Sequence, residues 1–240
     1  GYDQPNRSHF KSTENWLTGS GGALKNEKSG WMARFLEDRY PGYNGTPFDG
    51  EPDPLALLFG NTISTGFHSA AEHRLEINLS GQEPSGFYTM ISSLGGVPIM
   101  DIPDTDHGGI LNHIQTISNS VNVYASRISD TFNNGTNSAD YPNSSLGNQL
   151  KTIARMMAGG SRTKIYMASK GGWDNHNNMV QYNNNTEGTH ANLLGDLSES
   201  VAAFQEDIQN MGLDNKVLTV IFSEFGRKII QNGSRGTDHG

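Results

Sequence analysis

Apolar residues recur every three or four positions along five stretches of the chain, a spacing that places them on one side of an α-helix. The clearest stretch is SLGNQLKTIARMMAGG, in which a single apolar stripe ends at a pair of glycines. We therefore predict helices over residues 8–19, 29–40, 110–132, 145–160 and 189–212, the last of them with Thr189 as its N-cap.

Shorter apolar runs between these helices predict a short buried element at DPLALLFG (53–60) and strands at TKIYMASK (163–170) and NKVLTVIFSEFG (215–226). The last holds the longest apolar run, Val217 to Phe222, which is continuous rather than alternating and therefore fits a central parallel strand. Strand, long helix and strand in this order form a βαβ unit. Short alternating runs at about 62–100 predict a small β-rich insertion. The pattern as a whole predicts an α/β fold.

A chain of 240 residues is long enough for one large domain, and no internal repeat divides it. We predict a single domain over residues 1–240. The chain opens on GYDQPNRSHF without an initiator methionine and closes on GTDHG, directly after an ionisable pair. From these two features we expect the domain to be partial, cut within a larger protein at both ends.

Composition and charge argue against some classes of function and limit the residues that could bind a metal ion. The formal net charge is −8 and no Lys/Arg cluster is visible, which argues against nucleic-acid binding. No apolar run approaches the length of a membrane span. Cysteine is absent, so His, Asp or Glu must hold any metal ion. Richness in Asn, Gly and Ser without cysteine suits an exported bacterial protein.

Three polar clusters follow the predicted strands or lie just beyond them: GGWDNH, SEFGR and GTDHG. Parallel sheets place their sites beyond the carboxyl ends of the strands, so these clusters are expected to meet at one edge. His190, in the first turn of its helix, would point to the same edge. Mixed carboxylate and imidazole ligands suit zinc or manganese, with calcium as a further candidate. The candidate metal ligands are Asp174, His176, His190, Glu224, Asp238 and His239.

Ordinary structural roles compete with each of these assignments. Asp174 and His176 can form a hydrogen-bonded pair within a loop, Glu224 can pair with Arg227, and His190 can be a packing residue. A second metal-like stretch, DIPDTDHGG at 101–109, lies in a Pro/Gly-rich loop and is better explained by Asx turns. Convergence of several clusters carries more weight than any one of them.

Seven segments, in order, resemble the bacterial domain-of-unknown-function family 1501: PNRSHF…WLTG, DPLAL, NQLKTIARMMAGG, TKIYMASKGGWDNH, GTHANLLGDLSESVAAFQ, VIFSEFGRKI and NGSRGTDHG. That family looks like a branch of the alkaline phosphatase and sulfatase superfamily. The resemblance implies a three-layer sandwich around a mostly parallel sheet. It also implies export to the periplasm or the cell exterior. Members have an upstream strand and a further strand after GTDHG, which fits the expectation of a partial domain.

The resemblance also implies roles for individual residues. Asp174 matches the superfamily Asp that follows a strand, and His176 and His190 both match the His that comes next. Glu224-Phe225 stands where an Asp-His pair is usual, which keeps a carboxylate and loses an imidazole. His239 matches the last superfamily His. Asp238 is either a ligand or a residue that orients one.

The start of the chain resembles the sulfatase segment in which a Cys or Ser opens a helix that ends in Thr-Gly. Ser8 matches the nucleophile, and Arg7 is placed to hold a sulfate or phosphate oxygen. A helix N-terminus favours anion binding, and metal coordination lowers the pKa of a hydroxyl. The alternative is that Ser8 only caps the helix.

These observations favour an exported, metal-dependent hydrolase of phosphate or sulfate esters, with a small molecule or a glycan ester as substrate. Attack would come from Ser8 or from water, and Glu224 would be a ligand or a general base. The alternative is an exported carbohydrate-binding or scaffold protein that has kept the fold and lost the chemistry. Phe225 motivates it, and the loops at 40–50 and 171–185 could face a carbohydrate.

Overall fold

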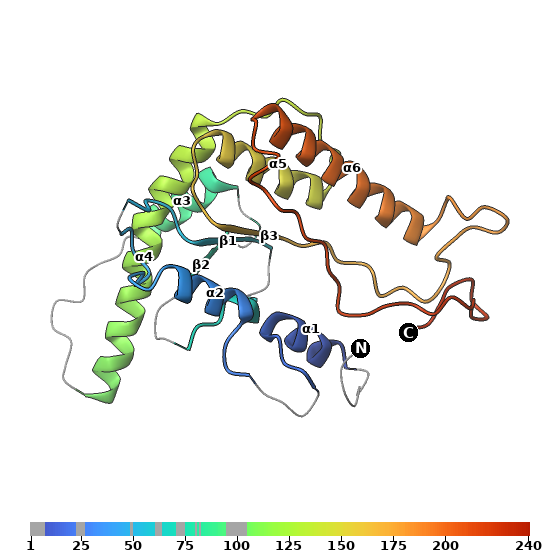
Figure 1. Cartoon of the computed structure of the whole chain (residues 1–240), viewed down its shortest axis with the longest axis horizontal. Coiled ribbons are helices and arrows are strands. Elements are labelled where there is room, and N and C mark those ends of the chain that lie inside the picture. The colour runs from blue at the N-terminus through green and yellow to red at the C-terminus, as the bar shows by residue number, and fades with distance from the viewer. Residues whose placement is uncertain are drawn as a thin grey trace.

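The structure is a computed structural model. It describes residues 8–22, 27–48, 50–60, 64–70, 75–79, 81, 83–94 and 105–240. Three parallel strands form one sheet in the order β2-β1-β3, and helices lie on both sides of it (Figure 1). The predicted α/β class is confirmed. The complete three-layer sandwich stays a prediction, because the described residues form only this small sheet.

Strand β1 (Ala56–Phe59) is the centre of the sheet. Its four residues are all buried, which is the environment that a continuous apolar run predicts for a central parallel strand. It pairs with β2 (Glu76–Asn78) on one edge and with β3 (Ile165–Ala168) on the other. The strand predicted within 163–170 is thus confirmed, and the short buried element predicted at 53–60 contains the strand β1.

All five predicted helices are present. Within 62–100, where a β-rich insertion is expected, the described residues contribute β2 to the same sheet, a 3₁₀ turn at Thr65–Phe67 and a helix. None of the described helices is long and apolar enough to cross a bilayer. The α-helices are α1 (His9–Thr18), α2 (Trp31–Arg39), α3 (Pro84–Leu94), α4 (Asp106–Asn134), α5 (Ser145–Ala158) and α6 (Thr189–Asn210).

The start of α6 differs from the predicted start in the identity of its N-cap. The N-cap is Gly188 and not Thr189, and no side chain caps the first turn. Gly188 has a φ of 123°, which favours glycine, and a Cβ there would lie 2.6 Å from the carbonyl oxygen of Met179. The chain therefore enters α6 one residue earlier than the capping pattern predicts.

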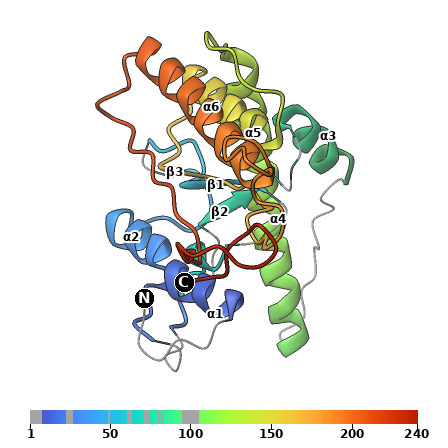
Figure 2. The same cartoon turned by 90° about the vertical axis from the view of Figure 1, so that its right-hand side faces the viewer.

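Helices α5 and α6 lie on one side of the sheet, and α1 and α2 lie on the other (Figures 1 and 2). Between them a single apolar cluster joins the strands to α2, α4, α5 and α6. Leu57 of β1 and Ile208 of α6 are fully buried in it. The loop after β3 and the segment after α6 both extend from this core toward α1 (Figures 1 and 2).

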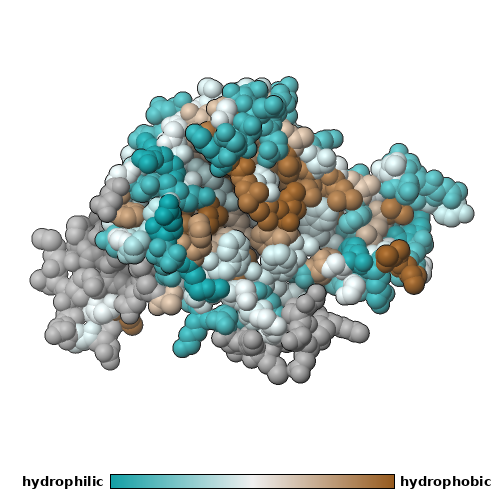
Figure 3. Space-filling view, in the orientation of Figure 1, coloured by the Kyte–Doolittle hydropathy of each residue, from teal (hydrophilic) through white to brown (hydrophobic). Residues whose placement is uncertain are grey.

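The predicted strand at Val217–Phe222 is wrong. No described strand pairs with this segment, and Leu218 and Val220 are 85% and 66% exposed. A parallel strand needs partners on its edges and cover on its faces, but the described residues supply no partner strand and leave most of this run exposed. Instead, Gln205 donates a hydrogen bond to Thr219 (2.7 Å) and Phe222 stacks on Trp16 of α1. Figure 3 shows hydrophobic side chains gathered where the chain runs on from α6.

We predict that Leu218→Ser changes the free energy of unfolding by less than about 0.5 kcal/mol, because the side chain is already exposed. The buried counterpart, Leu57→Ala, should cost about 2–5 kcal/mol. Urea unfolding of both variants measures the contrast. A loss of similar size at both positions would mean that residues 217–222 are buried in the folded protein.

Candidate metal centre

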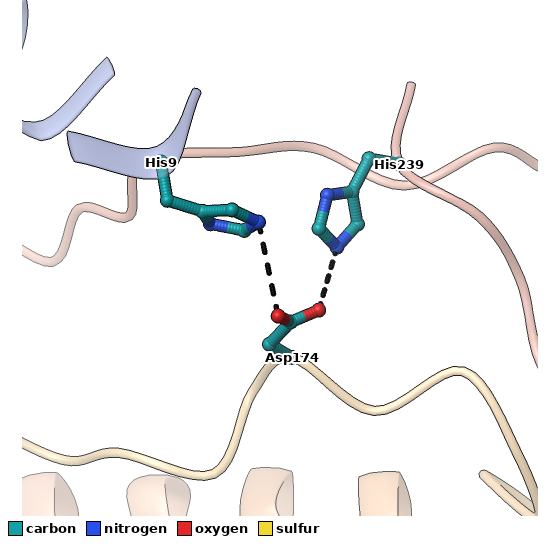
Figure 4. A group of neighbouring side chains, drawn as sticks. All are labelled: His9, Asp174 and His239. Carbon is teal, nitrogen blue, oxygen red and sulfur yellow. Dashed lines mark hydrogen bonds and ion pairs between the residues drawn. The ribbon is translucent and has the colours of Figure 1, made fainter. Parts of the chain in front are cut away.

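Three segments that are far apart in the sequence meet near the two ends of the chain. They are the first turn of α1, the loop after β3 and the C-terminal segment, and they contribute His9, Asp174 and His239 (Figure 4). The Nε2 atom of His239 lies 3.0 Å from Oδ1 of Asp174, and Nε2 of His9 lies 3.7 Å from Oδ2. The expected approach of Asp174 to His239 is therefore present.

The loop after β3 is held near its start and by a turn of its own. Near its start, Lys170 pairs with Asp196 of α6. Gly172 then takes a left-handed backbone conformation, with a φ of 90°, and its carbonyl accepts a hydrogen bond from the Asn175 side chain (3.0 Å). This turn projects the side chain of Asp174, which lies between the two residues, away from the loop.

The C-terminal segment folds back on itself. Residues Arg227 and His239 form an antiparallel bridge, in which Lys228 N–H donates to Asp238 and Gly240 N–H donates to Gly226, both at 2.9 Å. Backbone pairing thus fixes His239 beside the segment that carries Glu224. It explains how GTDHG and SEFGR reach one site without a strand at 217–222.

Helix α1 presents His9 to this site. Ser8 is the N-cap and accepts a hydrogen bond from the Lys11 N–H at 3.4 Å, so His9 is the first helical residue. Its Nδ1 lies 3.2 Å from Oε1 of Glu224 while its Nε2 faces Asp174. His9 is not among the candidate ligands predicted from the sequence. The available signal was an imidazole directly after Ser8, in a segment already assigned to the site by resemblance.

The geometry of the three residues suits a metal ion. One ligand atom from each lies within 4.8 Å of the others. In a tetrahedral zinc shell with bonds of about 2.0–2.1 Å, ligand atoms are separated by about 3.3 Å, so the three side chains would have to move closer together to bind zinc and would leave a fourth position open. Two imidazoles and a carboxylate are donors for zinc or manganese, whereas calcium prefers a larger set of oxygens.

Further predicted residues surround this group. His176 contacts Asp174 (Nε2 to Oδ1, 3.0 Å), and its Nδ1 lies 3.6 Å from Oδ1 of Asp238. Glu224 contacts His9, as described above. The three predicted residues therefore lie around the His9–Asp174–His239 group, where they can orient its imidazoles or complete a coordination shell.

An aromatic ring closes one side of the site. Phe225 stacks on His239 with ring centroids 3.9 Å apart and meets His9 edge-on at 5.2 Å. At the position where the resemblance implies an imidazole, the phenyl ring offers no ligand atom. It restricts the orientation of the two imidazoles instead.

The charges of the site favour an ionised carboxylate. Desolvation alone would raise the pKa of Asp174, but the hydrogen bond and charge of His239, the charge of His9 and the hydrogen bond of His176 outweigh it. The pKa of Asp174 therefore lies below its ordinary value of 3.8. Asp174 is thus ready to bind a cation at neutral pH.

Other predicted residues lie elsewhere. The ring of His190 packs edge-on against Trp173 at 5.9 Å, and its buried Nδ1 has no hydrogen-bond partner in the part of the chain that the structure describes. Burial and the charge of Arg227 lower the pKa of His190. No hydrogen bond or ion pair among the described residues joins His190 to Asp174. Arg7 and residues 101–104 of the second metal-like stretch lie outside the described residues.

Comparisons with known proteins agree with part of the sequence interpretation. No curated protein and no solved structure matches the chain. Residues 125–240, which carry Asp174, Glu224 and His239, match the family model described as a protein of unknown function, DUF1501. That match supports the assignment of this part of the chain to the DUF1501 family.

Proposed function

We propose that this protein is an exported, metal-dependent hydrolase of phosphate or sulfate esters. The observation that carries the proposal is the meeting of His9, Asp174 and His239, from three distant segments, with ligand atoms within 4.8 Å of one another. Carboxylate and imidazole side chains converge in this way when they hold a divalent cation or a network of protons. The family resemblance of the surrounding motifs favours the cation.

The residues around the site can take different roles in ester hydrolysis. A divalent ion bound there supplies charge stabilisation for the ester oxygens. Glu224, one-third exposed and in contact with His9, is placed to accept a proton from an attacking hydroxyl or water. Ser8 stands directly before His9 at the N-terminus of α1, where the helix dipole favours an anion. Ser8 is our candidate nucleophile, with water as the alternative.

Turnover of aryl phosphates and aryl sulfates by the zinc- or manganese-loaded protein tests this proposal. With Ser8 as nucleophile, Ser8→Ala should lower kcat by on the order of 10³-fold or more. Thr105→Ala is the matched control, because Thr105 also caps a helix through its side chain (3.1 Å to Gly108 N–H) but begins α4. Both variants lose a cap worth about 1 kcal/mol, so only chemistry separates them.

The second candidate is a binding or scaffold protein that has kept the fold without the chemistry. Phe225, stacked on His239, favours this alternative because it occupies the position of an expected ligand. Tyr182, 79% exposed in the Asn-rich loop that follows the site, is a surface on which a sugar ring could stack. Glycan binding without turnover of either ester class would favour this candidate and contradict the hydrolase.

A further inference from the structure

We infer that Arg227 is a positioning residue, which sets the geometry of the proposed metal centre by tying the loop of Asp174 to the segment of His239. The inference rests on the proposed metal binding. Arg227 lies outside the group of candidate ligands and carries a positive charge, so its action on a cation must be indirect.

The contacts of the guanidinium group carry the argument. One terminal nitrogen donates to the carbonyl of Trp173, the residue before Asp174. The other donates to the carbonyl of Thr237 at 2.8 Å, two residues before His239. A single planar group therefore links the backbones that carry two of the three ligands.

The backbone of Arg227 adds to this link. It lies opposite His239 in the antiparallel bridge that folds the C-terminal segment back. The guanidinium carbon also lies 5.3 Å from the centre of the Phe225 ring, and that ring stacks on His239. Arg227 thus limits the position of His239 through both the main chain and a side chain.

The ion pair with Glu224, one alternative left open by the sequence, is not among the contacts of Arg227 with described residues. Glu224 pairs with His9, while the guanidinium of Arg227 donates to two backbone carbonyls. A guanidinium holds two acceptors in a fixed plane, whereas the single ammonium of lysine does not fix their relative orientation. The Arg227→Lys variant therefore keeps the positive charge but no longer holds the two carbonyl acceptors in a fixed relative orientation.

A second contact shows how closely the same two segments approach. A Cβ on Gly236 would lie 2.0 Å from the carbonyl oxygen of His176, so any side chain at this position must push the segments apart. Gly236→Ala is therefore an independent way to separate Asp174 from His239 without touching either ligand or Arg227.

The test uses Co²⁺, whose visible absorption reports the geometry of its ligands. Affinity and spectrum are measured for the wild type, Arg227→Lys, Arg227→Ala and Gly236→Ala, with far-UV circular dichroism as a check of folding. Arg235→Lys is the matched control, because Arg235 is exposed in the same segment and its guanidinium, among the described residues, donates only to the side chain of Asn178. We expect Arg227→Lys and Gly236→Ala to weaken Co²⁺ binding about 10- to 100-fold and to alter the spectrum, while Arg235→Lys changes neither.

Chemical rescue distinguishes a loss of ligand positioning from a general loss of protein stability. Free guanidinium, added to Arg227→Ala well below denaturing concentrations, should restore part of the affinity and the wild-type spectrum. A wild-type affinity and spectrum in Arg227→Lys would overturn the inference, as would weaker binding with an unchanged spectrum and no rescue. Absence of Co²⁺ binding by the wild type would instead overturn the proposed function.

Discussion

Replacing Asp174 by alanine is expected to abolish stoichiometric binding of zinc or manganese. Asp174 is the only member of the His9–Asp174–His239 group with a negative charge, and it contacts both imidazoles. Its loss leaves two histidines that no longer share an acceptor. We expect the dissociation constant to rise by more than about 100-fold, beyond the range seen when only a supporting group is lost.

Isothermal titration with zinc measures this effect directly. Asp140→Ala is the control, because Asp140 is also an exposed aspartate and lies in the segment between α4 and α5, which contributes no residue to the site. An Asp174→Ala protein that binds zinc with the affinity of the wild type would remove this carboxylate from the ligand set.

Replacing Asp207 by alanine is expected to lower the free energy of unfolding by about 3–5 kcal/mol. Asp207 of α6 is 2% exposed. Its carboxylate accepts five hydrogen bonds from the segment between α4 and α5, at 2.7–2.9 Å. The donors are the N–H and hydroxyl of Ser138, the N–H of Ala139 and the side chains of Asn137 and Tyr141.

The loss is large because these donors would remain without their acceptor in a place that water reaches poorly. Chemical unfolding in urea is the measurement, and Glu206→Ala, at the exposed neighbouring position, is the control with an expected change below about 0.5 kcal/mol. A change of that small size in Asp207→Ala would show that the segment between α4 and α5 is anchored in some other way.

The same carboxylate predicts a dependence of stability on pH. Burial alone would raise the pKa of Asp207, but the hydrogen bonds from Asn137, Ser138 and Tyr141 outweigh it and lower the pKa below 3.8. The stabilisation is therefore complete above the ordinary carboxyl pKa. It declines as the pH falls below 3.8 and is lost once the pH passes the lowered pKa. Asp207→Asn should show a shallower decline over this range of pH.

Local patterns predicted most of the fold because they depend on residues close in sequence. The five helices and the strand β3 follow from apolar patterns and from helix-ending glycines, and β1 lies where a short buried element is predicted. The run Val217–Phe222 has an equally strong local pattern, but a strand also needs neighbours, and the described residues provide none. The sequence of the run does not determine whether a distant segment lies beside it to form a sheet.

The candidate site was predictable in part for a related reason. The sequence identified Asp174 and His239 as neighbours because both follow segments expected to end at one sheet edge. It overlooked His9, which reaches them from the opposite end of the chain and whose own surroundings look like an ordinary helix start. It also grouped His190 with them, whereas the first turn of α6 directs that ring against Trp173.

The most direct test of the account is a crystal of the full chain grown with zinc, with anomalous diffraction recorded on both sides of the zinc absorption edge. The account predicts one strong anomalous peak about 2.0–2.2 Å from Nε2 of His9, Nε2 of His239 and a carboxylate oxygen of Asp174. Intact, well-ordered density for these three side chains with no anomalous peak between them would contradict it.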